Sequence, residues 1–181
     1  MKLLKRRLLF ITLLLTIGIH AQNRDVEIKV QKLTNSVHML VGQGGNIAVF
    51  VGADGVFMID DQFAPLTPKI LAAIKTITDS SVKYVINTHW HGDHTGGNLN
   101  MEQAGAVIVS HENVRKRMSM NQVIRGKKRK ASAKKALPII TFSKDMMYHF
   151  NGDDVFISHI HDAHTDGDAF VYFTNNNVLH M

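Results

Sequence analysis

The apolar residues in the first part of the chain fall into short runs rich in β-branched side chains. Four such runs lie between residues 26 and 61: VEIKVQKL, VHMLVG, NIAVFVG and GVFMIDD. Short apolar runs divided by Gly, Asn and Asp are typical of strands joined by tight turns. We therefore predict that residues 26–61 form an antiparallel meander.

The period of the apolar residues changes after Pro68. From Ile70 to Ile77 they recur at i, i+1, i+4 and i+7, which places them on one face of a helix. We expect Thr67 to be the N-cap of this helix, with Pro68 in its first turn. Predicted strands then alternate with predicted helices: VKYVIN, residues 98–104, AVIVS and residues 111–121. This alternation indicates an α/β crossover arrangement.

Strand patterns return after Pro138. The runs are IITF, MMYHF, DVFISHIH, AFVYFT and VLHM. Together with the meander and the crossover, they predict a mixed α/β (α+β) fold. The basic segment before them, residues 125–135 (RGKKRKASAKK), is expected to be a solvated linker or helix.

Residues 1–21 have the layout of a secretory signal peptide. The basic MKLLKRR precedes the apolar run LLFITLLLTIGI, and HAQ offers a cleavage point after Ala21. The apolar run is shorter than the ~20 residues of a membrane span, so we expect no stable membrane anchor. The prediction is an exported protein, periplasmic or secreted, whose domain occupies residues 22–181.

The net charge of +6 depends mainly on this signal. Four of the 21 basic residues and none of the 15 acidic residues lie within residues 1–21, which leaves 17 basic against 15 acidic residues. A nearly neutral domain attracts a phosphate backbone weakly, so we predict a small-molecule substrate and no nucleic-acid partner.

The chemistry of the chain is concentrated in NTHWHGDHTGG, residues 87–97. His89 and His91 are two residues apart, so in an extended segment both side chains point the same way and can bind one ion. Asp93 and His94 are adjacent and can reach a second ion beside the first. The chain has no cysteine, and imidazole combined with carboxylate suits Zn²⁺ best.

The string HWHGDH matches the pattern H-x-H-x-D-H and resembles the metallo-β-lactamase fold superfamily, over most of residues 26–181. That family has an αββα sandwich with metals at the strand ends between two sheets, and this chain would be its N-terminal part. The resemblance implies that His89, His91 and His164 hold the first metal. Asp93 and His94 would begin the second site.

The resemblance also implies a role for Asp60, at the end of VFMID. A carboxylate there would lie near the metals and orient a ligand imidazole. In AHTDGD, which contains His164, we expect Asp166 and Asp168 to make turn hydrogen bonds instead of binding metal.

The expected activity is that of an exported zinc-dependent hydrolase of metallo-β-lactamase type. Metal-bound hydroxide would attack a carbonyl in a lactam, ester or thioester, and Asp93 would orient or deprotonate the water. The alternatives are a glyoxalase-II-like thioesterase or lactonase, and an inactive truncated fragment or non-catalytic zinc-binding module.

By the same resemblance, complete members of the family continue beyond Met181 with further ligands of the second metal. We therefore expect one zinc site, an incomplete second site, and a first sheet that lacks its partner layer. An uncovered apolar sheet face would favour self-association.

Overall fold

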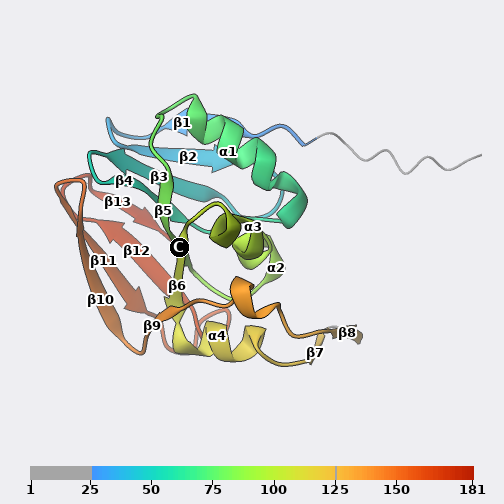
Figure 1. The fold of residues 1–181 in the computed structure, drawn as a ribbon. Helices are drawn as coiled ribbons and strands as arrows, with labels where there is room; N and C mark the ends of the chain where they lie inside the picture. Colours follow the sequence, from blue (N-terminus) through green and yellow to red (C-terminus); the bar gives the residue numbers. More distant parts are fainter. Residues whose placement is uncertain (1–25, 125) are drawn as a thin grey trace, which may run out of the picture.

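The computed structural model describes residues 26–124 and 126–181 (Figure 1). The expected signal peptide at residues 1–21 lies outside this part of the chain. Across the described residues, no helix combines the length and the hydropathy that crossing a membrane requires.

Seven strands form the larger of the two main sheets, in the order β1-β2-β3-β4-β5-β6-β9. The first four strands are antiparallel neighbours, so the predicted meander is confirmed. The next three continue the sheet in parallel, as the crossover pattern predicts. The strands are β1 (Lys29–Lys32), β2 (Val37–Val41), β3 (Ile47–Gly52), β4 (Gly55–Ile59), β5 (Val82–Asn87), β6 (Val107–His111) and β9 (Ile140–Phe142).

The helices lie in the connections of this sheet. They are α1 (Thr67–Lys75), α2 (Gly92–Thr95), α3 (Asn98–Gln103) and α4 (Glu112–Met118), with short 3-10 turns at Ala64–Leu66 and Lys134–Ala136. The helices predicted at 98–104 and 111–121 are thus confirmed, the second one shorter than expected.

The predicted N-cap of α1 is wrong. Leu66 occupies the N-cap position with φ −89° and ψ −15°, and Thr67 is already the first helical residue. A capping side chain needs an extended backbone to reach the first free amides. Here the 3-10 turn runs straight into α1, so no extended residue precedes the helix.

Four antiparallel strands form the smaller main sheet, in sequence order. They are β10 (Asp145–Phe150), β11 (Asp153–His159), β12 (Ala169–Phe173) and β13 (Val178–His180). A separate hairpin of β7 (Gln122–Ile124) and β8 (Lys127–Arg129) projects beyond α4 (Figure 1). Within the basic run, residues 126–131 are exposed, in agreement with the predicted solvated segment, but Lys127–Arg129 form a strand of this hairpin.

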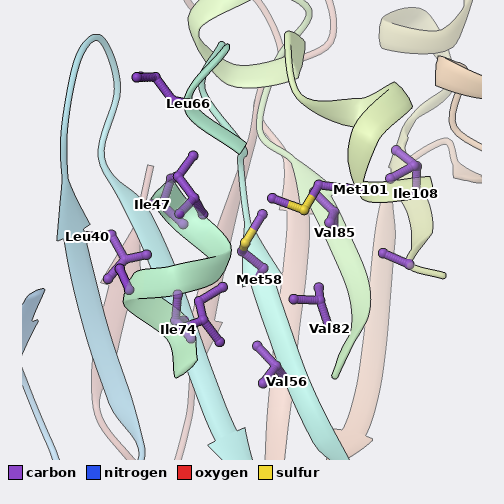
Figure 2. Close-up of a cluster of buried hydrophobic side chains, with 14 residues drawn as sticks. Leu40, Ile47, Val56, Met58, Leu66, Ile74, Val82, Val85, Met101 and Ile108 are labelled. Carbon is purple, nitrogen blue, oxygen red and sulfur yellow. The ribbon is translucent and has the colours of Figure 1, made fainter. Parts of the chain in front are cut away.

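Each face of the larger sheet has its own apolar core. On one face α1 and α3 pack against the strands, through side chains such as Ile74 and Met101 (Figure 2). The opposite face packs against the smaller sheet, and the rings of Phe50 and Phe173 lie 5.1 Å apart across this interface. The described residues thus form three layers, helices, sheet and sheet.

The expectation that the first sheet lacks its partner layer is therefore wrong, because β11 and β12 cover it. Apolar side chains remain exposed on the other face of the smaller sheet. Met147, Phe156, Tyr172 and Leu179 are successive cross-strand neighbours there, and Met147 and Leu179 are 46% and 54% exposed. Self-association stays a prediction, and the smaller sheet now offers the surface for it.

Candidate metal centre

The motif residues lie where two parallel strands of the larger sheet end. β4 and β5 are neighbours, so Asp60, which follows β4, lies beside the segment that starts at Asn87. The backbone amide of Asp60 donates to the carbonyl of Ile86 at 2.8 Å. The carboxyl ends of parallel strands are where α/β sheets commonly bind ligands.

Three histidines converge at this edge. His89, His91 and His164 each offer a ring nitrogen, and these three atoms lie within 4.8 Å of one another. His164 comes from the loop between β11 and β12, and its Nε2 lies 3.0 Å from Nδ1 of His91. The structure therefore brings together the three residues that the resemblance assigns to the first metal.

The surroundings keep two of these imidazoles neutral. Burial lowers the pKa of His89 to about 4, and the charge of His94 adds to this effect. Burial, followed by the charge of His164, lowers the pKa of His91. A neutral imidazole has the free lone pair that metal binding requires.

Asp93 and His94 lie next to this cluster, in the short helix α2. The rings of His94 and His89 are 3.9 Å apart, and Nε2 of His94 lies 3.5 Å from Oδ2 of Asp93. Among the described residues, no third candidate ligand joins this pair to make another cluster. The pair can contribute two ligands to a second ion.

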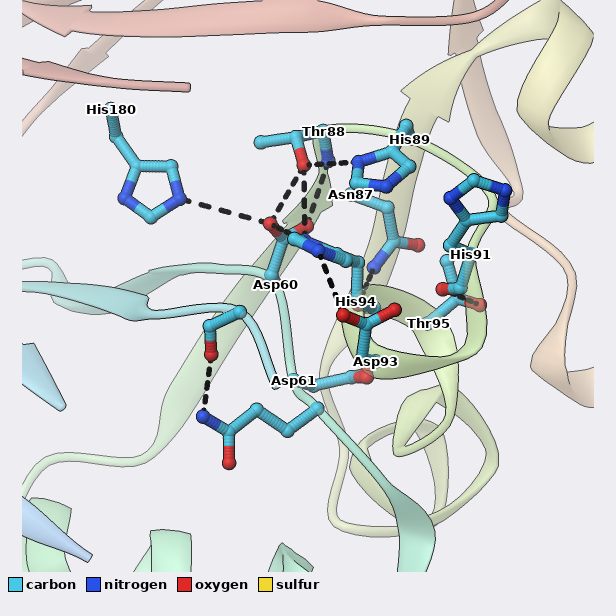
Figure 3. A network of polar contacts seen from close by, with 12 residues as sticks. Asp60, Asp61, Asn87, Thr88, His89, His91, Asp93, His94, Thr95 and His180 are labelled. Atoms are coloured by element: carbon cyan, nitrogen blue, oxygen red, sulfur yellow. Dashed lines mark hydrogen bonds and ion pairs between the residues drawn. The ribbon is translucent and has the colours of Figure 1, made fainter. Parts of the chain in front are cut away.

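Asp60 determines how His94 is oriented (Figure 3). Its Oδ2 lies 2.7 Å from Nδ1 of His94 and accepts a hydrogen bond from the Thr88 hydroxyl at 2.7 Å. Its Oδ1 accepts the backbone N–H of Thr88 at 2.8 Å. A proton on Nδ1 leaves Nε2 of His94 free for a metal.

Asp60 is completely buried. Burial by itself would raise the pKa of its carboxyl group, but hydrogen bonds from His180 and His94 outweigh burial and hold the pKa well below its usual range. In return, Asp60 raises the pKa of His94 against the opposing effect of burial. The structure thus places Asp60 beside a motif imidazole, as the resemblance implies.

His180 is a neighbour of this site that the sequence reasoning missed. Its Nε2 lies 3.7 Å from Oδ2 of Asp60, and its ring points toward that carboxylate (Figure 3). The position depends on how β13 pairs with β12 and on how the two sheets pack. No local sequence signal carries that information.

Asp61 and Asn87 fix the motif loop through hydrogen bonds to its backbone. The backbone amide of Asp61 and the side-chain amide of Asn87 both donate to the carbonyl of His94. Asp61 also accepts the backbone N–H of Gly97 through Oδ1 at 2.8 Å. Burial raises the pKa of Asp61 well above its usual value, and the hydrogen bond from Gly97 opposes this shift only in part. The second carboxyl group in IDDQ, that of Asp61, was the sequence signal for a residue that supports the motif loop.

A glycine turn closes over Asp93 and His94. A Cβ atom on Gly45 would lie 2.4 Å from Cε1 of His94, and one on Gly44 would lie 2.6 Å from Cβ of Asp93. Gln62 holds the turn by donating from Nε2 to the carbonyl of Gly45 at 2.6 Å. The turn QGGN therefore needs glycine because the metal-motif side chains occupy the space.

The turn role expected for Asp168 is confirmed. Its carboxylate accepts the backbone N–H of Thr165 at 2.7 Å and the Thr165 hydroxyl at 2.5 Å. Asp166 instead forms an ion pair with Arg117 at 2.8 Å. These contacts fix the loop that carries His164.

Comparison with known proteins agrees with this architecture. A sequence model of the metallo-beta-lactamase superfamily matches residues 40–181. The beta-lactamase-like protein 2 homolog of Caenorhabditis elegans is 28% identical over 78 residues, which cover 38% of this chain and 26% of that protein.

Solved structures show a similar fold. A metallo-beta-lactamase from Pontibacter korlensis has a TM-score of 0.68 at 22% identity, covering 84% of this chain and 70% of its own. A beta-lactamase from Chitinophaga pinensis has a TM-score of 0.72 at 15% identity, and the match covers 82% of this chain and 58% of that protein's chain. A subclass B3 metallo-beta-lactamase of Bradyrhizobium japonicum has a TM-score of 0.68 at 16% identity, covering 81% and 57%.

This chain spans little more than half of the last two structures and about a quarter of the curated relative. The match over residues 40–181 nevertheless includes the whole H-x-H-x-D-H motif and His164. The chain belongs to the metallo-beta-lactamase superfamily.

Proposed function

We propose that this protein is an exported zinc-dependent hydrolase that attacks the carbonyl group of a lactam, an ester or a thioester. The observation that carries the proposal is the convergence of His89, His91 and His164, whose ring nitrogens lie within 4.8 Å. Membership of the superfamily and the similar folds of metallo-beta-lactamases support a hydrolytic reaction.

The donor set fits zinc. Tetrahedral Zn–N bonds of about 2.0–2.1 Å place the nitrogens of three imidazoles roughly 3.3 Å apart. In the structure the three ring nitrogens lie within 4.8 Å of one another. Three imidazole ligands also leave a fourth position for water, which is the ligand pattern of catalytic zinc.

In this mechanism the three histidines bind the ion, and Asp93 accepts the proton of the attacking water. When bound, zinc lowers the pKa of a water molecule to about 7 and polarises the carbonyl. Asp93 lies in the same short helix as His94 with its side chain 38% exposed, so it can accept a proton from water in the site. Asp60 holds His94 in one orientation through Nδ1.

Lactams are the first substrate class to test, because the similar structures from Pontibacter and Bradyrhizobium are described as metallo-beta-lactamases. The fold hosts many chemistries, so esters and thioesters belong in the same panel. Hydrolysis of the thioester without hydrolysis of the lactam would favour the alternative function, a glyoxalase-II-like thioesterase.

The test compares the zinc-loaded full chain with Asp93→Ala. We expect hydrolysis of at least one member of a panel with nitrocefin, a lactone and a thioester. Asp93→Ala should lose at least 100-fold in kcat/KM, on the scale of one general base, while keeping bound zinc. Asp79→Ala, at an exposed acid that follows α1 and is paired with Lys75, serves as the control and should match the wild type. Bound zinc without any turnover would favour a non-catalytic zinc-binding module.

A further inference from the structure

The charges of this chain are unevenly distributed along the sequence. Between Glu112 and Asp145 there are 11 basic residues and no acidic residue. The remainder of residues 22–181 has 6 basic against 15 acidic residues. The nearly neutral domain therefore contains one strongly basic stretch, residues 113–144, which we call the acid-free segment. The proposed hydrolysis gives no reason for it.

Most of the acid-free segment occupies one region of the fold. It runs through α4, the β7–β8 hairpin and the 3-10 turn Lys134–Ala136, and the hairpin projects beyond α4 (Figure 1). The base of the hairpin is fixed to α4, because the backbone N–H of Ser132 donates to the carbonyl of Met118 at 2.8 Å. The hairpin is thus the part of this region that can contact a surface outside the molecule.

The cations of the acid-free segment differ in whether they already have a partner. Arg117 forms an ion pair with Asp166 at 2.8 Å, and Lys135 lies 3.5 Å from Glu102. The exposed lysines of the hairpin form no ion pair with any residue that the structure describes, and they are Lys127, Lys128 and Lys130. Their charges are therefore available to an anionic partner.

The two faces of the hairpin have different surroundings. Gln122 faces the body of the protein, since its side-chain amide donates to the backbone carbonyl of Arg117. Val123, the next residue along the strand, points to the opposite face and is 69% exposed. Lys128 is its cross-strand partner, and Lys130 lines the same surface hollow. The outward face of the hairpin therefore combines an exposed apolar side chain with unpaired cations.

This combination fits a membrane of anionic lipids better than a nucleic acid. Lysines attract the phosphate groups of either partner, but the headgroup layer of a membrane also removes an apolar side chain from water. Surfaces that bind single-stranded nucleic acid instead offer aromatic rings on which the bases stack. Phe142 is the one aromatic residue in the sequence between Glu112 and Asp145, and it is buried.

We propose that the outward face of the β7–β8 hairpin docks reversibly on membrane surfaces that contain anionic lipids. Val123 enters the headgroup layer, and the three unpaired lysines lie next to lipid phosphates. Each lysine near such a surface contributes roughly 5-fold in affinity, so three together contribute about 100-fold. The contact is peripheral, and it therefore differs from a membrane anchor.

The test measures co-sedimentation of the full chain with phosphatidylcholine vesicles that contain about 30% phosphatidylglycerol, at ~0.1 M NaCl. We expect the triple variant Lys127→Gln/Lys128→Gln/Lys130→Gln to bind about 100-fold more weakly than the wild type. Val123→Ser should bind about 10-fold more weakly, the scale of burying one valine side chain. Vesicles of phosphatidylcholine alone should bind the wild type as weakly as they bind the triple variant.

The controls make the same changes outside the acid-free segment. Lys29→Gln/Lys32→Gln/Lys83→Gln removes three exposed lysines of β1 and β5, and Val30→Ser replaces an apolar side chain that is 41% exposed. Both controls should bind as the wild type does. Every variant keeps the basic and apolar residues 1–21, so differences between variants report on the hairpin. All of the substituted side chains are exposed, so the melting temperatures should match the wild type.

Two kinds of result would overturn the inference. The first is a wild type that does not bind the anionic vesicles, or hairpin variants that bind them as tightly as their controls. The second is a wild type that binds a DNA duplex of about 20 base pairs, with Val123→Ser unchanged on both the duplex and the vesicles, because the partner would then be a nucleic acid. Neither result depends on bound zinc, so the proposed function and this inference can fail separately.

Discussion

Oδ2 of Asp60 lies 2.7 Å from Nδ1 of His94, and the carboxylate that makes this contact has no exposure to solvent. A buried charge is retained where hydrogen bonds compensate its lost hydration. Here Thr88 and His94 supply those bonds, and His180 approaches from the other sheet. The contact therefore couples the packing of two sheets to the orientation of a motif imidazole.

Asp60→Asn should weaken the site without emptying it. The amide lacks the charge that holds the Nδ1 proton of His94, so we expect a loss of 10- to 100-fold in the affinity for a second ion at His94 or in kcat/KM, as for other residues that orient a ligand histidine. Isothermal titration with Zn²⁺ measures the first quantity. Asp79→Asn, at an exposed acid paired with Lys75, is the control and should change neither. Equal affinities in Asp60→Asn and the wild type would contradict the role of Asp60.

Gly45→Ala tests the close approach of the QGGN turn to His94. The added methyl group would lie 2.4 Å from the imidazole, so either the turn or the ring must move. We expect a loss of about 1–3 kcal/mol in the free energy of unfolding, the usual cost of overpacking. Urea denaturation measures it, with exposed Asn46→Ala as the control. Unchanged stability in Gly45→Ala would show that the turn has room.

Phe173→Ala tests whether the two sheets form one cooperative unit. Phe173 is fully buried between them, so its truncation should cost about 3–5 kcal/mol. Tyr172→Ala, the next residue, points to the other face of the same strand and should cost about 1 kcal/mol. Similar small losses in both variants would mean that the smaller sheet does not pack on the larger one.

The pH dependence of stability should depend in part on His111. This ring stacks on His159 with 3.9 Å between centroids, and burial, followed by the charge of His159, lowers the pKa of His111 below its ordinary 6.5. The unfolded chain therefore binds the proton more readily, and stability falls as the pH drops from about 6.5 through the folded pKa.

His111→Gln should reduce the difference in unfolding free energy between pH 7.5 and pH 5.0, measured by urea denaturation of the metal-free chain. A steeper pH dependence in His111→Gln would reverse the assigned sign.

Much of this architecture could be predicted because its signals are local. The strand runs and the helix after Pro68 follow from periodicity, and the spacing of His89 and His91 predicts a shared ion. His164 lies 73 residues away from His91, so only the family resemblance could join it to them.

What could not be predicted depends on packing between distant segments. The approach of His180 to Asp60 requires the register of β13, in which His180 lies opposite Val171 of β12. The prediction that Thr67 is the N-cap of α1 was wrong for a related reason. The preceding 3-10 turn, which no residue pattern indicates, carries the backbone into α1 without an extended residue.

Zinc binding by the full chain, measured by equilibrium dialysis on the wild type, His164→Ala and His161→Ala, tests the central claim most directly. His161 is an exposed histidine three residues before His164, so it controls for the loss of an imidazole from the same segment. We predict that the wild type and His161→Ala each bind zinc and that His164→Ala binds it at least 100-fold more weakly, because a catalytic zinc site needs three protein ligands. A wild type that binds no zinc, or a His164→Ala variant that binds it as tightly as the wild type, would contradict the three-histidine centre.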